Sequence, residues 1–173
     1  MTAEPELRAA FHQHKDAVYR FAWRMTRSPA LAEDITQEVF LSLTRRPAEC
    51  KRTRDQLRAF LLGIARNLAF KHWRNDKRWK SLEDDQFVAA PLNLEEFGVT
   101  AAVASAIGAL APLQREALIL AEYEGLSLQE IAEITDTEPG TIKARLHRAR
   151  ENLKRMLAPF RNTRNSREYG TAK

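Results

Sequence analysis

The 173-residue chain has a single cysteine, Cys50, and no long apolar run. One cysteine excludes a disulfide within the chain and a cysteine-rich zinc site. No segment approaches the roughly 20 apolar residues that a membrane span needs, and the charged N-terminus lacks the apolar core of a signal peptide. We therefore expect no membrane insertion and a cytoplasmic location.

Motifs for catalysis are also missing. The sequence has no phosphate-binding glycine loop, no metal-spaced histidines and cysteines, and no nucleophile beside a base. Isolated histidines are more often surface or core residues than ligands, and the four present are scattered, at His12, His14, His72 and His147. We expect no catalytic residue, no metal and no cofactor.

Charge is distributed unevenly along the chain. Residues 1–80 hold 17 Lys/Arg and 9 Asp/Glu, residues 81–100 hold none and 5, and residues 101–173 hold 11 and 9. From Thr141 onward there are ten Lys/Arg and two Asp/Glu. Two cationic regions flank an acidic connector, as expected of a chain that contacts a polyanion at two places.

Apolar residues at spacings of three and four predict an all-α fold with two small helical domains. In residues 1–80 we expect three helices. The first covers about residues 4–26, the second begins at Pro29 and is capped by Ser28, and the third covers about residues 56–75 and is capped by Asp55. Residues 81–100 are an acidic linker. In residues 101–160 we expect four helices. Thr100 caps the first, Pro112 opens the second, Ser127 caps the third, and Pro139 opens the fourth, which ends at Pro159. Residues 161–173 form a basic, disordered tail.

The expected second helix carries an outward acidic and amide cluster. A solvated surface and a docking site explain it equally well; it consists of Glu33, Asp34, Gln37 and Glu38.

The end of the expected third helix combines positive charge with indole rings. Cations that follow phosphates and aromatic faces that stack on bases suit single-stranded or locally opened nucleic acid. The alternative is that Trp73 or Trp79 covers the hydrophobic core. The basic strip remains in either case.

A helix-turn-helix occupies residues 126–157. Ser127 and Glu130 form a capping box, Thr135 to Thr137 form the turn, and Pro139 opens a second helix. One face of that helix is apolar, whereas the other is basic and polar and suits the major groove. A charged helix face can also be merely solvated.

Three segments resemble the extracytoplasmic-function sigma factors, the compact two-domain class of bacterial RNA polymerase specificity subunits. They are AEDITQEVFLSL at 32–43, LRAFLLGIARNLAFKHWRN at 57–75, and the segment from LAPLQREAL to HRARENL at 110–153. The resemblance covers nearly the whole chain except the extreme termini and the linker.

The resemblance implies the partners and roles of several residues. The second helix would grip the beta-prime clamp coiled coil of core RNA polymerase through Asp34, Gln37 and Glu38, and the C-terminal domain would meet the beta flap. The loop around residues 49–54 would capture a base flipped from the minus-10 element. Contacts to that element, including the locally melted strand, are implied for Arg52, Arg54, Asn67, Lys71, His72, Arg74 and Asn75.

The resemblance also implies that the helix-turn-helix reads the double-stranded minus-35 element. The residues concerned are Thr141, Lys143, Ala144, Arg145, His147 and Arg148, with Arg145 and Arg150 expected to hold phosphate or the fold. The linker would follow the RNA exit path, and an anti-sigma factor is an expected further partner.

Three positions depart from the family pattern. Asp136 stands where a left-handed glycine is common, Ala144 replaces a hydroxyl residue, and Lys71 falls where many relatives have Asp. Two other functions remain open: a dimeric helix-turn-helix repressor that binds a palindrome, and a sigma mimic that only titrates an anti-sigma protein.

Overall fold

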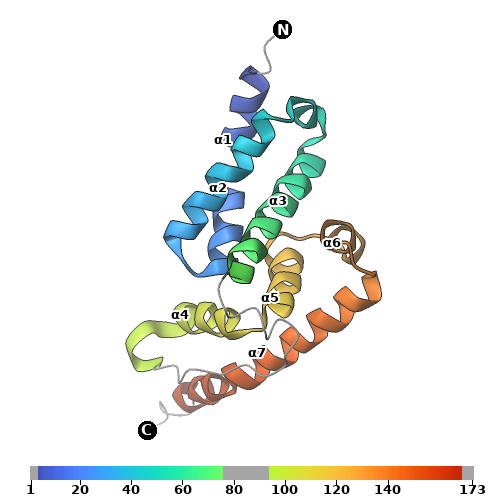
Figure 1. The fold of residues 1–173 in the computed structure, drawn as a ribbon. Helices are drawn as coiled ribbons and strands as arrows, with labels where there is room; N and C mark the ends of the chain where they lie inside the picture. Colours follow the sequence, from blue (N-terminus) through green and yellow to red (C-terminus); the bar gives the residue numbers. More distant parts are fainter. Residues whose placement is uncertain (1–3, 76–93, 169–173) are drawn as a thin grey trace.

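The computed structural model describes residues 4–75 and 94–168, and every regular element in those ranges is helical. The N-terminal half holds α1 (Glu4–Thr26), α2 (Pro29–Thr44), the 3₁₀ turn η1 (Pro47–Lys51) and α3 (Arg54–Asn75). The C-terminal half holds α4 (Leu94–Ala109), α5 (Pro112–Leu118), the π-helical turn η3 (Ile119–Tyr123), α6 (Leu128–Thr135) and α7 (Pro139–Glu168). The all-α prediction is confirmed (Figure 1).

The three N-terminal helices pack on one another. Their apolar residues at helical spacing meet in a common interior, where the largest fully buried side chains are Phe21, Met25, Ile35, Leu43 and Leu61. Burial of each such side chain contributes about 1.5–3 kcal/mol. Ser28 caps α2 by accepting a hydrogen bond from the Leu31 amide at 3.3 Å, as its position before Pro29 predicts.

The C-terminal helices pack around α7, which contacts α4, α5 and α6. Ile131 from α6, Ile119 and Leu120 from η3, and Ile142 from α7 are fully buried there. The two halves are not separate in the structure. Contacts of α3 with α6 and of α1 with α4, α5 and η3 join them (Figure 1), and one cluster of buried residues extends through both.

The cap of α3 differs from the prediction. The Gln56 amide donates to Thr53 Oγ1 at 3.4 Å, and the Thr53 amide donates to Gln56 Oε1 at 3.2 Å. This reciprocal arrangement satisfies two amides that would otherwise lack partners at the helix start. Asp55 instead lies in the first turn, where a negative charge favours the helix dipole.

Pro159 does not end the last helix, and α7 continues through it to Glu168. Proline removes one backbone donor, but its fixed φ near −65° is itself a helical value, so the chain can continue beyond it. The first part of the expected disordered tail is therefore helical, and residues 169–173 lie outside the described residues.

Helix α4 also begins earlier than predicted, at Leu94, and is broken at Gly98, whose φ of 73° and ψ of 174° are not helical. The predicted start at Thr100 lies just beyond that break. The predicted helix over 112–124 changes to π-helical hydrogen bonding after Leu118. Most of the acidic linker and the basic strip from Lys77 to Lys80, including Trp79, lie outside the described residues.

Phe11, whose helical spacing from Leu7 and Val18 predicts a buried side chain, does not join the core. It is 40% exposed, and its ring packs edge-on against Phe40 with 5.0 Å between centroids.

Candidate nucleic-acid interface

The helix-turn-helix has the predicted local geometry. Ser127 Oγ accepts from the Glu130 amide, and the Glu130 carboxylate accepts from the Ser127 amide at 2.7 Å, which completes the capping box. These hydrogen bonds to the backbone and side chain of Ser127 lower the pKa of Glu130. Asp136 ends α6 in the left-handed conformation, with φ of 49° and ψ of 51°, and thereby turns the chain into α7.

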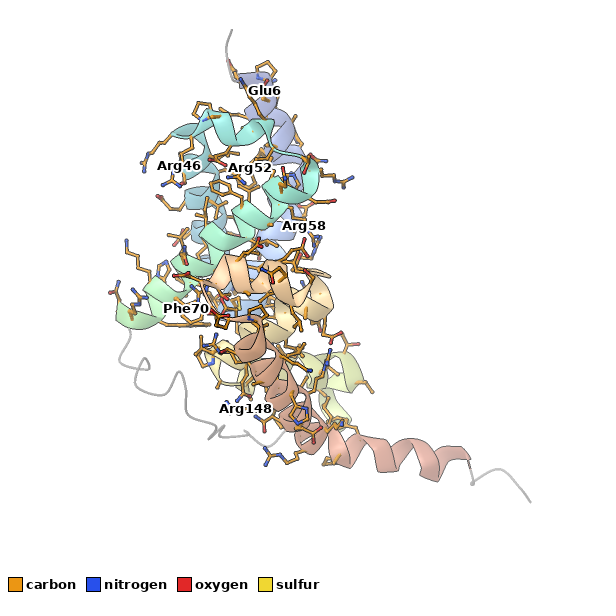
Figure 2. All side chains as sticks on the ribbon, turned by 90° about the vertical axis from the view of Figure 1, so that its right-hand side faces the viewer. Glu6, Arg46, Arg52, Arg58, Phe70 and Arg148 are labelled. Carbon is orange, nitrogen blue, oxygen red and sulfur yellow. The ribbon has the colours of Figure 1, made fainter. Side chains whose placement is uncertain are left out.

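Helix α7 presents its predicted basic face to solvent. Ile142, Leu146 and Ala149 are buried against the rest of the domain. Because these residues fix the rotation of the helix, the opposite face points outward. Thr141, Lys143, Ala144, His147 and Arg148 are exposed and Arg145 is half-buried. Figure 2 shows Arg148 on this helix.

Arg150 makes a contact within the C-terminal half, in which both side chains are about half exposed. Its Nε donates to Glu122 Oε1 at 3.1 Å, which ties α7 to the π-helical turn η3. Arg145 is close enough to the buried Glu116 carboxylate to lower its pKa, although burial itself has the larger effect and raises that pKa.

The acidic cluster lies on the exposed face of α2. Asp34, Gln37 and Glu38 are exposed, while Ile35 on the other face is buried. A pocket of about 260 Å³ joins this face to the end of α3; its lining includes Asp34, Glu38, Lys71, His72 and Asn75. The structure thus places residues predicted for polymerase and for minus-10 DNA around one depression.

A second depression, of about 540 Å³, lies between η1, α3 and α6. Its wall on the N-terminal half carries the charged residues Arg46, Arg52 and Asp55 and the amide of Asn67 around the partly apolar surface of Phe60 and Ile64. We call it the α3–α6 groove. Its opposite wall carries Glu130, Glu133 and Ile134 from α6.

The predicted minus-10 residues therefore fall into two groups. Arg52 and Asn67 line the α3–α6 groove, whereas Lys71, His72 and Asn75 line the pocket beside α2. Arg54 and Arg74 are exposed and line neither. All seven are accessible to solvent, as a DNA-contacting role requires.

Trp73 adopts the core alternative. It is half-buried and packs edge-on against Phe70 with 5.1 Å between ring centroids. The Arg115 guanidinium of α5 lies 5.5 Å from its ring. The indole therefore helps to join the two halves of the chain.

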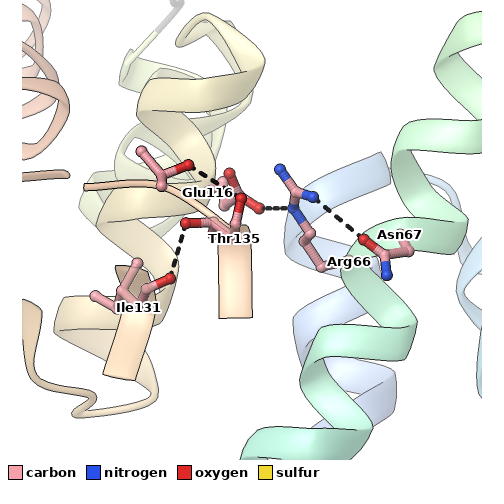
Figure 3. A network of polar contacts seen from close by, with 6 residues as sticks. Arg66, Asn67, Glu116, Ile131 and Thr135 are labelled. Atoms are coloured by element: carbon pink, nitrogen blue, oxygen red, sulfur yellow. Dashed lines mark hydrogen bonds and ion pairs between the residues drawn. The ribbon is translucent and has the colours of Figure 1, made fainter. Parts of the chain in front are cut away.

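Sequence reasoning missed the polar contacts that join those halves. Arg58 and Arg66, which lie on the face of α3 toward the C-terminal half, pair with Glu124 and Glu116. Figure 3 shows the Arg66–Glu116 pair. A local sequence motif cannot predict these pairs, because their members are 66 and 50 residues apart.

Within residues 4–75 and 94–168, no helix is long and apolar enough to cross a membrane. Over the same described residues, no group of three or more His, Cys, Asp or Glu side chains could hold a metal ion.

This geometry defines a DNA-binding helix-turn-helix protein with an added three-helix unit, and comparisons with known proteins specify the class. The family model for sigma-70 region 2 matches residues 10–79, and that for sigma-70 region 4 matches residues 100–153. The chain is 32% identical over 151 residues to the RNA polymerase sigma factor CarQ of Myxococcus xanthus, a match that covers 85% of this chain and 86% of CarQ.

Two further comparisons also match the chain to sigma factors. The ECF RNA polymerase sigma factor BldN of Streptomyces coelicolor is 31% identical over 155 residues, and the match spans 85% of this chain but 58% of BldN. The solved structure of the Bartonella quintana sigma factor RpoE, in complex with the anti-sigma factor NepR, superposes with a TM-score of 0.66 at 26% identity and covers 90% of this chain and 96% of RpoE.

The chain belongs to the extracytoplasmic-function (ECF) RNA polymerase sigma factors. Sigma factors are transcription initiation factors with no catalysis of their own. The resemblance carried by the three sequence segments is confirmed.

Proposed function

We propose that this chain binds core RNA polymerase and directs initiation at promoters with a minus-10 and a minus-35 element. One observation carries the proposal: two exposed surfaces of suitable charge lie on different halves of one chain. The acidic face of α2 lies on one half and the basic face of α7 on the other.

The acidic face of α2 is the polymerase contact. Asp34, Gln37 and Glu38 are free to meet a basic partner, and they bind the clamp coiled coil of the beta-prime subunit. The C-terminal half contacts the beta flap. These assignments rest on the family and on the exposure of the three side chains.

Helix α7 reads the minus-35 duplex. Lys143, His147 and Arg148 supply side chains that can reach base edges or phosphates in the major groove. Thr141, Ala144 and Arg145 complete this surface.

The N-terminal half opens and holds the minus-10 element. Extrusion of a base costs a few kcal/mol of stacking and pairing, which a protein pocket must offset. In this proposal Arg52 and Arg54 hold the backbone beside such a base, and the strand then runs along α3 past Asn67, Lys71, His72, Arg74 and Asn75. We further propose that the acidic linker, residues 81–100, follows the RNA exit path.

An anti-sigma factor is a further proposed partner, because the similar RpoE was solved in complex with NepR. A repressor that binds a palindrome as a dimer is the weaker alternative. It gives no role to the sigma-70 region 2 match over residues 10–79.

The test measures affinity for core polymerase. We expect Asp34→Arg with Glu38→Arg to lower that affinity at least about tenfold while the helical content stays unchanged. Asp16→Arg, at an exposed acid on α1, is the matched control and should bind normally. Unchanged affinity in the double variant would refute the α2 assignment.

A further inference from the structure

Leu41 is an apolar side chain exposed on the outer face of α2. It is 51% exposed, whereas its neighbours Val39 and Leu43 are fully buried and Phe40 is only 9% exposed. Because Val39 and Leu43 fix the rotation of the helix, Leu41 cannot turn inward. The core of the N-terminal half is therefore complete without it.

Helical geometry places Leu41 among the residues proposed to contact polymerase. At 3.6 residues per turn it lies about 20°, 40° and 60° around the helix axis from Asp34, Gln37 and Glu38. Arg45, which is one turn further along the helix than Leu41, is exposed as well. Amide, carboxylate and guanidinium groups therefore surround Leu41 on this face.

A single exposed leucine is ordinary on a protein surface, but this one coincides with polar groups that have no partner within the chain. In the part of the chain that the structure describes, the side chains of Asp34, Gln37 and Glu38 make no hydrogen bond and no ion pair. By contrast, carboxylates of α5 and η3 pair with arginines of α3 and α7. The α2 face thus combines an apolar centre with charges that are available to a partner.

Further apolar groups lie on both sides of this face. On the α1 side, Phe11 is 40% exposed and lies edge-on to Phe40, with 5.0 Å between the ring centroids. On the α3 side, the pocket of about 260 Å³ has Ile35 and Leu68 in its lining beside the carboxylates of α2. An apolar centre with a polar rim is typical of protein–protein interfaces.

The charged and the apolar groups of such a surface act at different stages of binding. Charges act over about 8–10 Å in physiological salt, speed the encounter, and lose this effect as the salt concentration rises. An apolar side chain acts only after contact, when its surface leaves water, so it mainly slows dissociation. Burial of the exposed half of a leucine side chain corresponds to about a tenfold change in affinity.

We propose that Leu41 is the apolar anchor of the polymerase contact: the aliphatic stems of basic side chains on the clamp coiled coil pack over Leu41, and their charged ends reach Asp34 and Glu38. Lysine and arginine suit this face because each carries an apolar stem and a cationic end. The surrounding polar groups exclude water from the anchor, as they do at other interface hot spots. This inference rests on the proposed function and adds the residue that slows dissociation of the complex.

The test measures the association and dissociation rates of the full-length chain on immobilised core polymerase, by surface plasmon resonance at several salt concentrations. Leu41→Ala removes the anchor and keeps a good helix former in α2, and Leu41→Met keeps an apolar side chain of similar volume. Val99→Ala is the matched control, because Val99 on α4 is also apolar and is 68% exposed. Asp34→Asn with Glu38→Gln removes the two charges and nearly preserves the shape of both side chains.

We expect Leu41→Ala to raise the dissociation rate about tenfold at every salt concentration. Its association rate should stay within about twofold of the wild type, because encounter depends on charge. Leu41→Met and Val99→Ala should behave like the wild type. The variant without the two charges should instead associate more slowly and show a weaker dependence of that rate on salt.

Equal dissociation rates of Leu41→Ala and the wild type, with the charge variant weakened, would overturn the anchor and leave the polymerase assignment of α2 in place. Normal binding by both variants would instead contradict the proposed function of α2. Sedimentation of the free chain gives a further check. If Leu41→Ala changes the oligomeric state and leaves polymerase binding unchanged, Leu41 belongs to an interface between two copies of the chain and the proposal is overturned.

Discussion

Asn152 Nδ2 donates a hydrogen bond to Gln114 Oε1 at 2.8 Å, and both side chains are buried. The bond joins α7 to α5 a short distance beyond the basic face of α7. With the apolar contacts of Ile142, Leu146 and Ala149, it fixes how the recognition helix is presented to DNA.

We predict that Asn152→Ala lowers the free energy of unfolding by about 1–3 kcal/mol, because it removes this donor from a buried amide oxygen. Urea unfolding followed by circular dichroism measures the change. Lys154→Ala, at an exposed site two residues away, should stay within about 0.5 kcal/mol of the wild type. Equal losses of unfolding free energy in both variants would show that the Asn152–Gln114 hydrogen bond contributes no more to stability than an exposed side chain does.

His14 predicts a pH dependence of stability. It is 2% exposed, its Nε2 has no hydrogen-bond partner among the described residues, and burial lowers its pKa below the ordinary 6.5, with smaller effects of Arg54 and Arg58 outweighing Asp55. The unfolded chain therefore takes up a proton at a pH where the folded chain does not. Stability is complete above pH 6.5 and falls as pH decreases through that value.

The measurement is the free energy of unfolding between pH 7.5 and about 5.5. His14→Leu should lose the part of the acid sensitivity that comes from this residue, whereas His12→Gln, an exposed histidine on the same helix, should keep it. The same slope in His14→Leu and the wild type would rule out this cause.

Asp136 predicts an ordered series of variants. Its positive φ of 49° is unfavourable for residues with a Cβ, costs about 1–2 kcal/mol for most of them, and is tolerated by Asp better than by Ala. We expect thermal stability to decrease in the order Asp136→Gly, wild type, Asp136→Ala. An alanine variant as stable as the glycine variant would show that the turn has relaxed to another conformation.

Local signals explain which parts of the fold the sequence predicts. Ser28 before Pro29 and Ser127 with Glu130 satisfy helix-start amides within four residues, so their roles do not depend on the rest of the fold. Apolar spacing likewise predicts the buried face of α7. The prediction that Asp55 caps α3 was wrong, because Thr53 and Gln56 satisfy each other's amides in the same turn.

Contacts between distant segments could not be predicted. A charge on α3 does not reveal which carboxylate it will meet, and the pairs of Arg58 and Arg66 form only after both halves have folded. The edge-on packing of Trp73 on Phe70 depends in the same way on how α3 meets α5. The predicted DNA-contacting residues are exposed except for the half-buried Arg145, whereas the contacts that join the two halves of the chain were not predicted.

Arg148 tests how α7 reads DNA. Arg148→Ala should weaken binding to the cognate minus-35 duplex by about 1–3 kcal/mol if the guanidinium contacts a base. Electrophoretic mobility shifts on cognate and scrambled duplexes give the difference. Equal weakening on both would make Arg148 a phosphate contact. Arg155→Ala, an exposed arginine farther along the same helix, serves as the comparison.

Start-site selection in a reconstituted system tests the central claim most directly. Purified full-length chain is added to sigma-free core RNA polymerase on templates that carry promoters mapped from transcript starts after overexpression. We predict run-off transcripts from a defined start that disappear when either the minus-10 or the minus-35 element is replaced. Transcripts that are absent, or that start at the same places with and without the chain, would contradict the assignment of this protein as a promoter-specificity subunit.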